Sequence, residues 1–328
     1  SCPWPSDHDS GGVLREHRPA EQRQGDDDAR RHEDIVARRG LVLAIGVVSH
    51  ALSIVAAMAA DTRELETIIV ERSDSGVTTI TLNRPFRKNA INDVMWGELH
   101  TEFDRLADSA DDRVVVLTGA DGDFCSGADV SGMGSGEGGE AAPRPHQLSA
   151  MRNVGDIALR LARLPQPTIA KVRGVAAGAG LNMALLCDLL VAGEDSRFSE
   201  IFARRGLTID FGGSWILPRR IGMHRAKELT LLADIIDADE AQEMGLVNRV
   251  LPDDELDGFT QDWADRLASG PPIALAMSKR LLNNSFSVTL EEALDDEGLS
   301  QTVNFGTKDT VEAVTAFMEK REPRFRGR

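Results

Sequence analysis

The chain has 328 residues, of which 41% are hydrophobic and 27% are charged, a composition typical of an ordinary globular protein. Its formal net charge of −16 disfavours bulk binding to nucleic acid, because an acidic surface repels phosphates. The 3 cysteines and 7 histidines lack the spacing of a metal site or a disulfide framework. We therefore expect no metal and a reduced, cytoplasmic setting.

Residues 1–57 are expected to be a disordered or non-native extension. Residues 1–40 hold few large apolar side chains and an acidic run at 26–28, which is typical of disorder. Residues 41–60 are almost wholly apolar, and three interpretations of them stay open. They form a membrane anchor, a secretory signal, or a stretch upstream of a true start at Met58.

Residues 58–268 are predicted to form a catalytic α/β body. Runs at 67–71 and Val77–Leu82 are separated by a Ser- and Gly-containing turn, which predicts a hairpin. Asn92 is expected to cap a helix with one apolar face. The remaining elements are expected in this order: strand 114–117, helix 154–164, strand 168–172, a glycine-rich turn at 174–180, a helix to 186, and strand 189–192. This alternation indicates an α/β fold with parallel strands.

Residues 269–328 are predicted to be a helical C-terminal part. Strand patterns stop after Pro271 and Pro272, and helices are expected at 273–284, 290–304 and 309–321. Before that boundary, Asp237 and Glu240 form a capping-box pattern ahead of a short helix that ends at Gly245.

Five sequence blocks follow one another along residues 62–326. They are Leu82-Asn83-Arg84-Pro85 with Asn89-Ala90-Ile91-Asn92, Phe124-Cys125-Ser126-Gly127-Ala128-Asp129, Gly174 to Asp188, Gly206 to Gly213, and Ala316 to Arg321. In order and spacing these blocks resemble the crotonase superfamily, the enoyl-CoA hydratase/isomerase enzymes. The resemblance implies a spiral of repeated ββα units and a coenzyme A thioester as the substrate. It implies no separate cofactor.

Two of these blocks resemble the oxyanion segments of the family. The resemblance assigns the backbone N–H groups of Ala128 and Ala179 to the negative charge that grows on a thioester oxygen. Gly127 belongs to the same substrate-binding segment. Ala179 stands in a Gly-Ala-Gly turn ahead of a helix, where unpaired N–H groups favour an anion. The alternative is that Gly178 and Gly180 only permit tight packing of a strand against a helix.

The acid/base positions depart from the hydratase pattern. By the same resemblance, Asn182 and Phe202 occupy the two positions at which a hydratase of this family has glutamates that hold one water between them. Neither side chain exchanges a proton near neutral pH. Asp210 instead matches the essential aspartate of several relatives, among them ring-forming isomerases, dienoyl-CoA isomerases and a dehalogenase. Phe202, Ile209, Phe211 and Trp215 are expected to make the substrate pocket apolar, which would raise the pKa of Asp210 toward the working range. The alternative role of Asp210 is that of a turn residue.

Glu200 and Asn182 are the second candidates for the site. Glu200 is expected to reach the site from a helix, and the alternative is a helix-surface residue paired with Arg204 or Arg205. Asn182 is expected to orient the substrate or a water. Asp129 is expected to be structural, with its side chain turned away.

The resemblance also implies where coenzyme A binds. Arg87, Lys88 and Ala90 lie in the segment that runs near the CoA nucleotide in the family, and an exposed loop charge is the alternative for the first two. Phe317 and Lys320 match positions that reach the CoA of a neighbouring subunit, so a homotrimer or a dimer of trimers is expected. Residues 132–142 are expected to form a mobile loop over the acyl pocket.

Three functions remain as hypotheses. The first is double-bond isomerisation in an acyl-CoA with Asp210 as the base. The second is an enoyl-CoA hydratase in which Asp210, with Glu200, activates water. The third is a non-catalytic protein that binds acyl-CoA.

Overall fold

The computed structural model describes residues 61–132 and 146–328, which belong to one compact unit, Ala59–Arg328. The apolar run at 41–60 and nearly all of the expected loop at 132–142 lie outside the described residues. Within the described ranges, no helix has the length and apolar character needed to cross a membrane.

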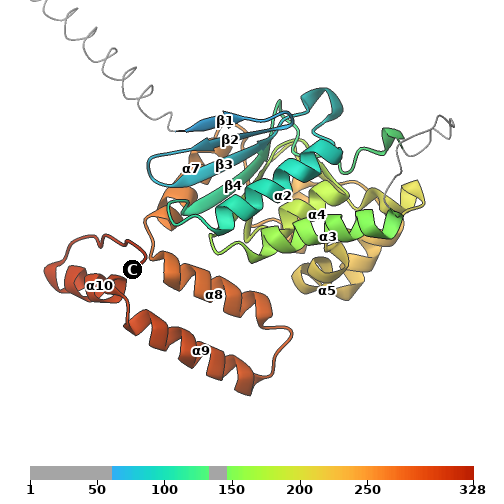
Figure 1. Ribbon diagram of the computed structural model, residues 1–328. Helices are drawn as coiled ribbons and strands as arrows, with labels where there is room; N and C mark the ends of the chain where they lie inside the picture. The colour runs from blue at the N-terminus through green and yellow to red at the C-terminus, as the bar shows by residue number, and fades with distance from the viewer. Residues whose placement is uncertain (1–60, 133–145) are drawn as a thin grey trace, which may run out of the picture. The chain divides into compact units, whose positions relative to one another are not determined.

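A large sheet forms the body of this unit (Figure 1). Over the described residues its strand order is β1-β2-β3-β4-β5-β7-β10. The strands are β1 (Thr62–Glu64), β2 (Ile68–Arg72), β3 (Val77–Leu82), β4 (Val114–Gly119), β5 (Thr168–Val172), β7 (Leu189–Gly193) and β10 (Arg249–Leu251). The β1–β2 and β2–β3 pairs are antiparallel, and every later pair is parallel. The predicted hairpin and the predicted α/β fold are confirmed.

A second, small sheet was not predicted. It joins β6 (Val175–Ala177), β8 (Arg197–Ser199) and β9 (Ile236–Asp237). These strands have two or three residues each, which is too short for a side-chain period to be visible in the sequence. The sheet matters for function because β6 leads directly into Ala179 and β8 leads directly into Glu200.

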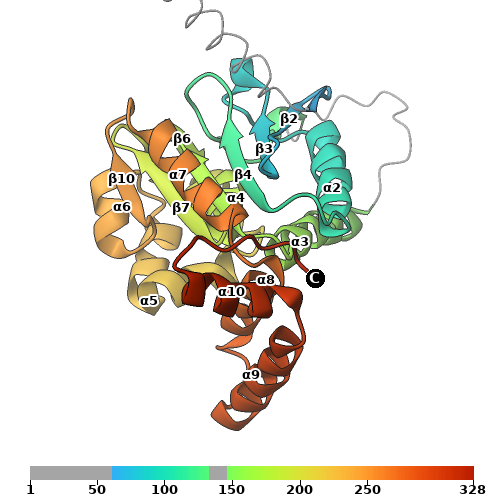
Figure 2. The same ribbon diagram turned by 90° about the vertical axis from the view of Figure 1, so that its left-hand side faces the viewer.

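Helices cover both faces of the large sheet. They are α2 (Asp93–Ala107), α3 (Gln147–Arg163), α4 (Ala179–Leu186), α5 (Gly213–Leu232), α6 (Ala238–Met244) and α7 (Leu256–Ala268), with 3-10 turns η1 (Pro85–Arg87), η2 (Val130–Gly132) and η3 (Ile201–Arg205). Figures 1 and 2 show α2 and α3 on one face and α7 on the other.

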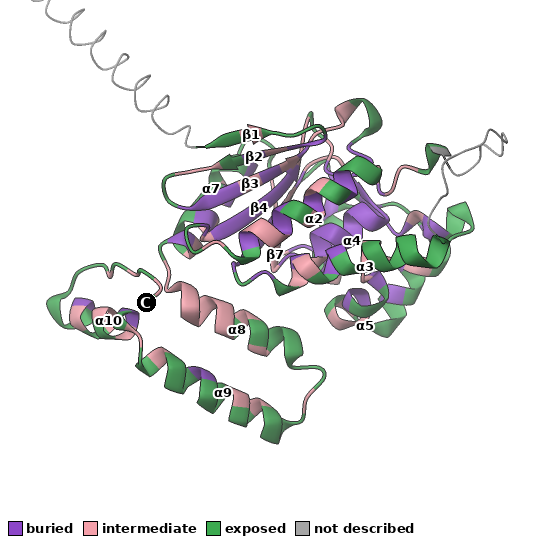
Figure 3. Ribbon diagram, viewed as in Figure 1, coloured by how far each residue is buried: buried purple, intermediate pink, exposed green. Residues whose placement is uncertain are grey.

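The two faces have separate apolar cores because neighbouring residues of a strand point to opposite sides. Val115 and Leu117 pack in the core under α2, α3 and α4. Val114 and Val116 pack in the core under α7. Figure 3 shows the resulting buried strands β3 and β4 between exposed helix surfaces.

The C-terminal part is helical, as expected. It consists of α8 (Pro272–Asn284), α9 (Leu290–Phe305) and α10 (Lys308–Glu319). Lys279 fastens α8 to the body, donating 2.9 Å to the Gln166 carbonyl oxygen and lying 2.7 Å from the Asp188 carboxylate. Asp237 caps α6 by accepting the Glu240 N–H, whereas both halves of a capping box are present at Thr289 and Glu292 of α9.

Candidate active site

The two expected oxyanion segments lie beside each other. Isolated parallel bridges join Ile91 to Ala128 and Cys125 to Ala176. The Ile91 N–H donates to the Gly127 carbonyl oxygen at 2.9 Å, and the Ala177 N–H donates to the Cys125 carbonyl oxygen at 2.9 Å. The segment of Ala128 is therefore held between residues 88–91 and β6.

Asn89 stabilises the conformation of the segment that leads to Ala128. Its side chain is fully buried, and its Nδ2 donates to the carbonyl oxygens of Ala120 and Asp123 at 2.9 and 2.7 Å. Its Oδ1 accepts the N–H of Arg84 at 2.9 Å. One buried amide thus ties the turn after β3 to the turn after β4, which satisfies polar groups that burial would otherwise leave unpaired.

Gly127 lies against the start of α4. Its φ is +98°, and a methyl group added there would lie 2.9 Å from the Ala177 carbonyl oxygen and 3.7 Å from the Ala179 nitrogen. Within residues 61–132 and 146–328, neither Ala128 nor Ala179 uses its N–H in a hydrogen bond. Ala179 is the first residue of α4, where N–H groups lack helical partners and attract anions. The oxyanion role of both residues stays a prediction that this arrangement favours.

A polar cluster lies next to this helix. Asn182, on α4, is fully buried. Its Nδ2 donates to the main-chain carbonyl oxygen of Asp210 at 3.0 Å and contacts Glu200 Oε2 at 3.4 Å. The structure therefore brings together three residues that the sequence separates by up to 28 positions.

Glu200 corrects the sequence analysis. It lies between the end of β8 and η3 and has no exposed surface, so the expectation that it reaches the site from a helix is wrong. The alternative, a surface ion pair with Arg204 or Arg205, is also wrong. Arg204 pairs with Asp234 at 2.9 Å instead.

Burial raises the pKa values of the Glu200 and Asp210 carboxyl groups. Burial, opposed by the Asn182 hydrogen bond and reinforced by the charge of Asp210, raises the pKa of Glu200 to about 8. Burial also raises the pKa of Asp210 to about 6. At neutral pH the cluster therefore holds one carboxylate, Asp210, and one neutral acid, Glu200.

Unpartnered polar atoms gather in the same cluster. Six buried side-chain nitrogen or oxygen atoms of the described residues have no hydrogen-bond partner, and Asn182 Oδ1, Glu200 Oε1 and Asp210 Oδ1 are three of them. Buried polar atoms are nearly always paired in a folded protein. Three unpaired polar atoms in one cluster indicate a place that forms hydrogen bonds with a substrate or a water.

Apolar side chains enclose part of the cluster. Phe202 is buried, and its ring would contact a methyl group at Gly178 at 3.5 Å. Phe211 is buried and stacks on Trp96 of α2, with ring centroids 5.4 Å apart. Trp215, expected to help line the pocket, is 40% exposed and lies 4.0 Å from the Arg219 guanidinium.

The sequence analysis missed Gly213 and Trp96. A methyl group at Gly213 would lie 2.4 to 2.6 Å from the amide atoms of Asn182, so only glycine fits there. The Gly212-Gly213 pair ahead of a helix was the visible signal for this close approach. Trp96 carried no comparable signal, because one aromatic residue on an apolar helix face is ordinary core.

The expected CoA contacts are distributed over two surfaces. Arg87 is exposed on η1, Lys88 lies 3.2 Å from the Asp123 carboxylate, and Ala90 is buried. Phe317 is 82% exposed on α10, and Lys320 is exposed just after it.

Asp129 is held by Arg84, as a structural role requires. Two guanidinium nitrogens of Arg84 lie 3.1 Å from its Oδ2. Hydrogen bonds from Ser131, with the charge of Arg84, lower the pKa of Asp129 to about 2. Asp129 is therefore a carboxylate at any physiological pH and is engaged away from the Glu200–Asp210 cluster.

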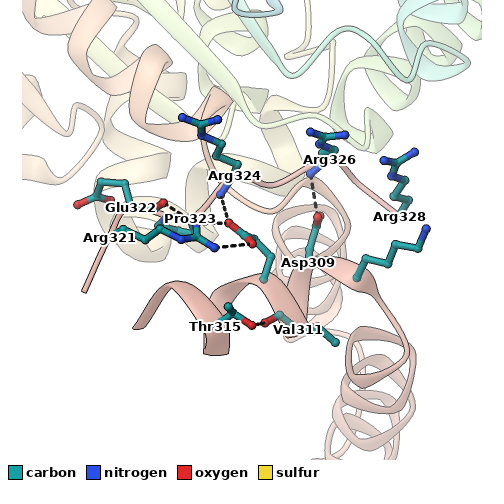
Figure 4. Close-up of a pocket in the computed structure, with 11 residues that line it drawn as sticks. Asp309, Val311, Thr315, Arg321, Glu322, Pro323, Arg324, Arg326 and Arg328 are labelled. Carbon is teal, nitrogen blue, oxygen red and sulfur yellow. Dashed lines mark hydrogen bonds and ion pairs between the residues drawn. The ribbon is translucent and has the colours of Figure 1, made fainter. Parts of the chain in front are cut away.

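A separate cavity of about 1050 Å³ lies between α10 and the C-terminal tail (Figure 4). Glu312 accepts hydrogen bonds from Arg321 and from the Arg324 N–H, and Asp309 accepts from the Arg326 N–H. These carboxylates hold the tail in place. Asn182, Glu200 and Asp210 do not line this cavity.

Comparison with known proteins gives a consistent family. The model of the family described as enoyl-CoA hydratase/isomerase matches residues 72–328. A 1,2-epoxyphenylacetyl-CoA isomerase of Escherichia coli is 36% identical over 260 residues, covering 79% of this chain and 98% of that protein. A short-chain-enoyl-CoA hydratase of Clostridium acetobutylicum is 34% identical over 260 residues, covering 79% of this chain and 97% of that protein. The crystal structure of an enoyl-CoA hydratase from Bacillus anthracis superposes with a TM-score of 0.75 at 32% identity, covering 80% and 100%.

Proposed function

The chain belongs to the enoyl-CoA hydratase/isomerase family and is an acyl-CoA enzyme of the crotonase type, and from that premise we propose that it moves a double bond within an enoyl-CoA. Asp210 is the proton carrier in this proposal. The observation that carries it is the pairing of a buried, unpartnered Asp210 Oδ1 with a pKa near 6. A base with that pKa is ionised at neutral pH and still returns its proton readily.

The reaction needs one carboxylate. Asp210 removes a proton from the carbon next to the thioester, and the electrons move into a dienolate whose negative charge rests on the thioester oxygen. The N–H groups of Ala128 and Ala179 stabilise that oxygen, each by roughly 3–4 kcal/mol in comparable oxyanion holes. The protonated Asp210 then returns the proton two carbons away, which moves the double bond and restores the carboxylate.

The residues around Asp210 favour this path over ordinary hydration. Asn182 and Phe202 cannot act as the paired acids that activate a water. Phe202 and Phe211 are buried, which excludes solvent from part of the site and sustains the raised pKa of Asp210. One of the relatives is named an isomerase of a CoA ester, in agreement with this assignment.

Hydration is the second candidate function, and a specific observation supports it. Glu200, Asp210 and Asn182 each have an unpartnered buried oxygen, so the cluster offers one water two acceptors, on Asp210 and Asn182, and the acid proton of Glu200. Relatives of this chain are also named hydratases. In this version Asp210 deprotonates the water and Glu200, as a neutral acid, protonates the substrate.

Product analysis separates the two functions. The protein is incubated with a 3-enoyl-CoA and with a 2-enoyl-CoA, and each reaction is followed by absorbance and mass. An unchanged mass with a shifted double bond supports isomerisation, and a gain of one water supports hydration. Asp210→Asn is expected to lower turnover by about 10²–10⁴-fold in either case, and full activity of that variant would refute the assignment of Asp210.

We also propose that CoA is bound by Arg87, Lys88 and Ala90 of one subunit, and that Phe317 and Lys320 reach the CoA of a neighbouring subunit. A homotrimer or a dimer of trimers, built through the C-terminal helices, is the assembly that this requires. In its support, α9 and α10 expose several large apolar side chains that a single chain leaves uncovered. They include Leu290, Leu299, Phe305, Val311 and Met318, each at least 65% exposed.

A further inference from the structure

We propose that Glu200 is a positioning residue of this site: it holds Asn182, and through Asn182 it holds the main chain of Asp210. The inference deepens the proposed function and rests on Asp210 being the base. It gives a role to Glu200, a carboxyl group with no exposed surface that the single-base mechanism does not use.

Direct contacts join Asn182, Glu200 and Asp210. The Asn182 amide nitrogen contacts Glu200 Oε2 at 3.4 Å and the Asp210 carbonyl oxygen at 3.0 Å. The Gly213 N–H donates to the same carbonyl oxygen at 2.9 Å, and a methyl group added at Gly213 would lie 2.4 to 2.6 Å from the Asn182 amide. A shift of Asn182 toward Glu200 therefore moves the loop that carries Asp210.

No cation balances a charge on Glu200. Among the described residues Glu200 forms no ion pair, and the charged group whose field acts on it is Asp210, which has the same sign. Arg197 on β8, Arg204 and Arg205 on η3, and Asp237 on β9 are exposed. On α5, Arg219 stacks on Trp215, and Arg220 donates to the carbonyl oxygens of Leu185 and Cys187 at the end of α4. A carboxylate at Glu200 is thus opposed by burial and by like charge.

Ionisation of Glu200 has two consequences for catalysis. The carboxylate attracts the Asn182 N–H more strongly than the neutral acid does, and it competes with the Asp210 carbonyl oxygen for that donor. It also adds a second negative charge beside a reaction that itself creates an anion. Turnover is therefore expected to fall as the pH rises through the pKa of Glu200, about 8.

The test is the pH profile of kcat for the wild type and for Glu200→Gln, which keeps the shape and the hydrogen-bonding group but cannot ionise. The wild type is expected to gain activity through pH 6 and to lose at least tenfold by two pH units above 8. Glu200→Gln is expected to keep the rise and lose the fall, with KM little changed. Glu200→Leu is expected to lose at least tenfold in kcat at every pH.

Two outcomes would overturn the inference. One is a Glu200→Gln variant that keeps the alkaline fall, and the other is a Glu200→Leu variant as active as the wild type. Carbon-13 NMR of labelled glutamate carboxyls gives a second measurement on the wild type itself. One glutamate is expected to titrate near pH 8, and nearer to neutrality in Asp210→Asn, because a like charge is removed. Absence of such a glutamate also overturns it.

The control Asp210→Asn separates this inference from the proposed function. If Asp210→Asn is fully active, the base has been misassigned and the proposed function fails. If Asp210→Asn is inactive but Glu200→Gln has the profile of the wild type, only the role of Glu200 fails.

Discussion

The side-chain amide of Asn182 donates a hydrogen bond to the main-chain carbonyl oxygen of Asp210 over 3.0 Å. Asn182 belongs to α4, which begins at Ala179, and Asp210 belongs to the turn that leads into α5. The bond therefore joins the helix expected to stabilise the thioester oxygen to the loop that carries the expected base. Because it uses the main chain of Asp210, it leaves both carboxylate oxygens available for chemistry.

Gly213→Ala is expected to damage this junction. The added methyl group would lie 2.4 to 2.6 Å from the Asn182 amide, so Asn182 or the start of α5 must move. We expect a loss of about 1–3 kcal/mol in the free energy of unfolding and a fall in kcat of at least tenfold. Chemical denaturation and steady-state kinetics measure the two effects.

The matched control is Gly97→Ala on the exposed face of α2, where an added methyl group meets nothing within 4 Å. This variant is expected to gain about 0.5–1 kcal/mol of stability with unchanged kcat. Equal kinetics in the two variants would show that the contact between Gly213 and Asn182 has no catalytic role.

Gly127→Ala is expected to move the N–H group of Ala128 away from that of Ala179. The residue has a φ of +98°, and its new methyl group would press on the Ala177 carbonyl oxygen at 2.9 Å. Misplacement of one donor is expected to lower kcat by about 10²–10³-fold with a small change in KM. Gly122→Ala is the control, because Gly122 has a φ of +82° but open space around it. Similar kcat losses in both variants would contradict the oxyanion assignment.

Glu200→Gln is expected to change how stability depends on pH. The pKa of Glu200 is raised from 4.5 to about 8, so the folded state keeps a proton that the unfolded state releases. The stability this proton provides is fully present below pH 4.5 and is lost as the pH rises to 8. Relative to Glu200→Gln, the wild type should lose up to about 5 kcal/mol of unfolding free energy across that interval. Urea titrations at several pH values measure the difference, and parallel curves would show that Glu200 is already ionised at neutral pH.

Arg87→Glu is expected to weaken binding of the CoA nucleotide. Arg87 is exposed on η1, where a positive charge would attract a phosphate and a negative charge would repel it. KM for an acyl-CoA is expected to rise roughly tenfold, which corresponds to about 1.4 kcal/mol. KM for the matching acyl-pantetheine, which lacks the nucleotide, should not change. Arg152→Glu, an equal charge reversal on the exposed side of α3, is the control and should leave both values unchanged.

Local patterns in the sequence predicted the elements whose signals are local. The Asn92 side chain caps α2 by accepting the Met95 N–H at 3.0 Å, as the pattern indicated. The hairpin of β2 and β3 and the helices of the C-terminal part also appear where their periodicity placed them. The sheet of β6, β8 and β9 escaped prediction because its strands are too short to repeat a pattern.

The sequence alone determined the family and predicted which residue of the site is the base. The order of its blocks indicates a CoA thioester enzyme, and Asn182 and Phe202 in the two hydratase glutamate positions leave Asp210 as the expected base. Only the tertiary structure decided the state of Glu200. Its neighbours along the chain include exposed arginines, which suggest a surface position, but the packing of η3 against α5 and the contact with Asn182 of α4 leave it without exposed surface. Burial is a property of contacts between distant segments, and for a carboxyl group it decides whether the side chain is charged.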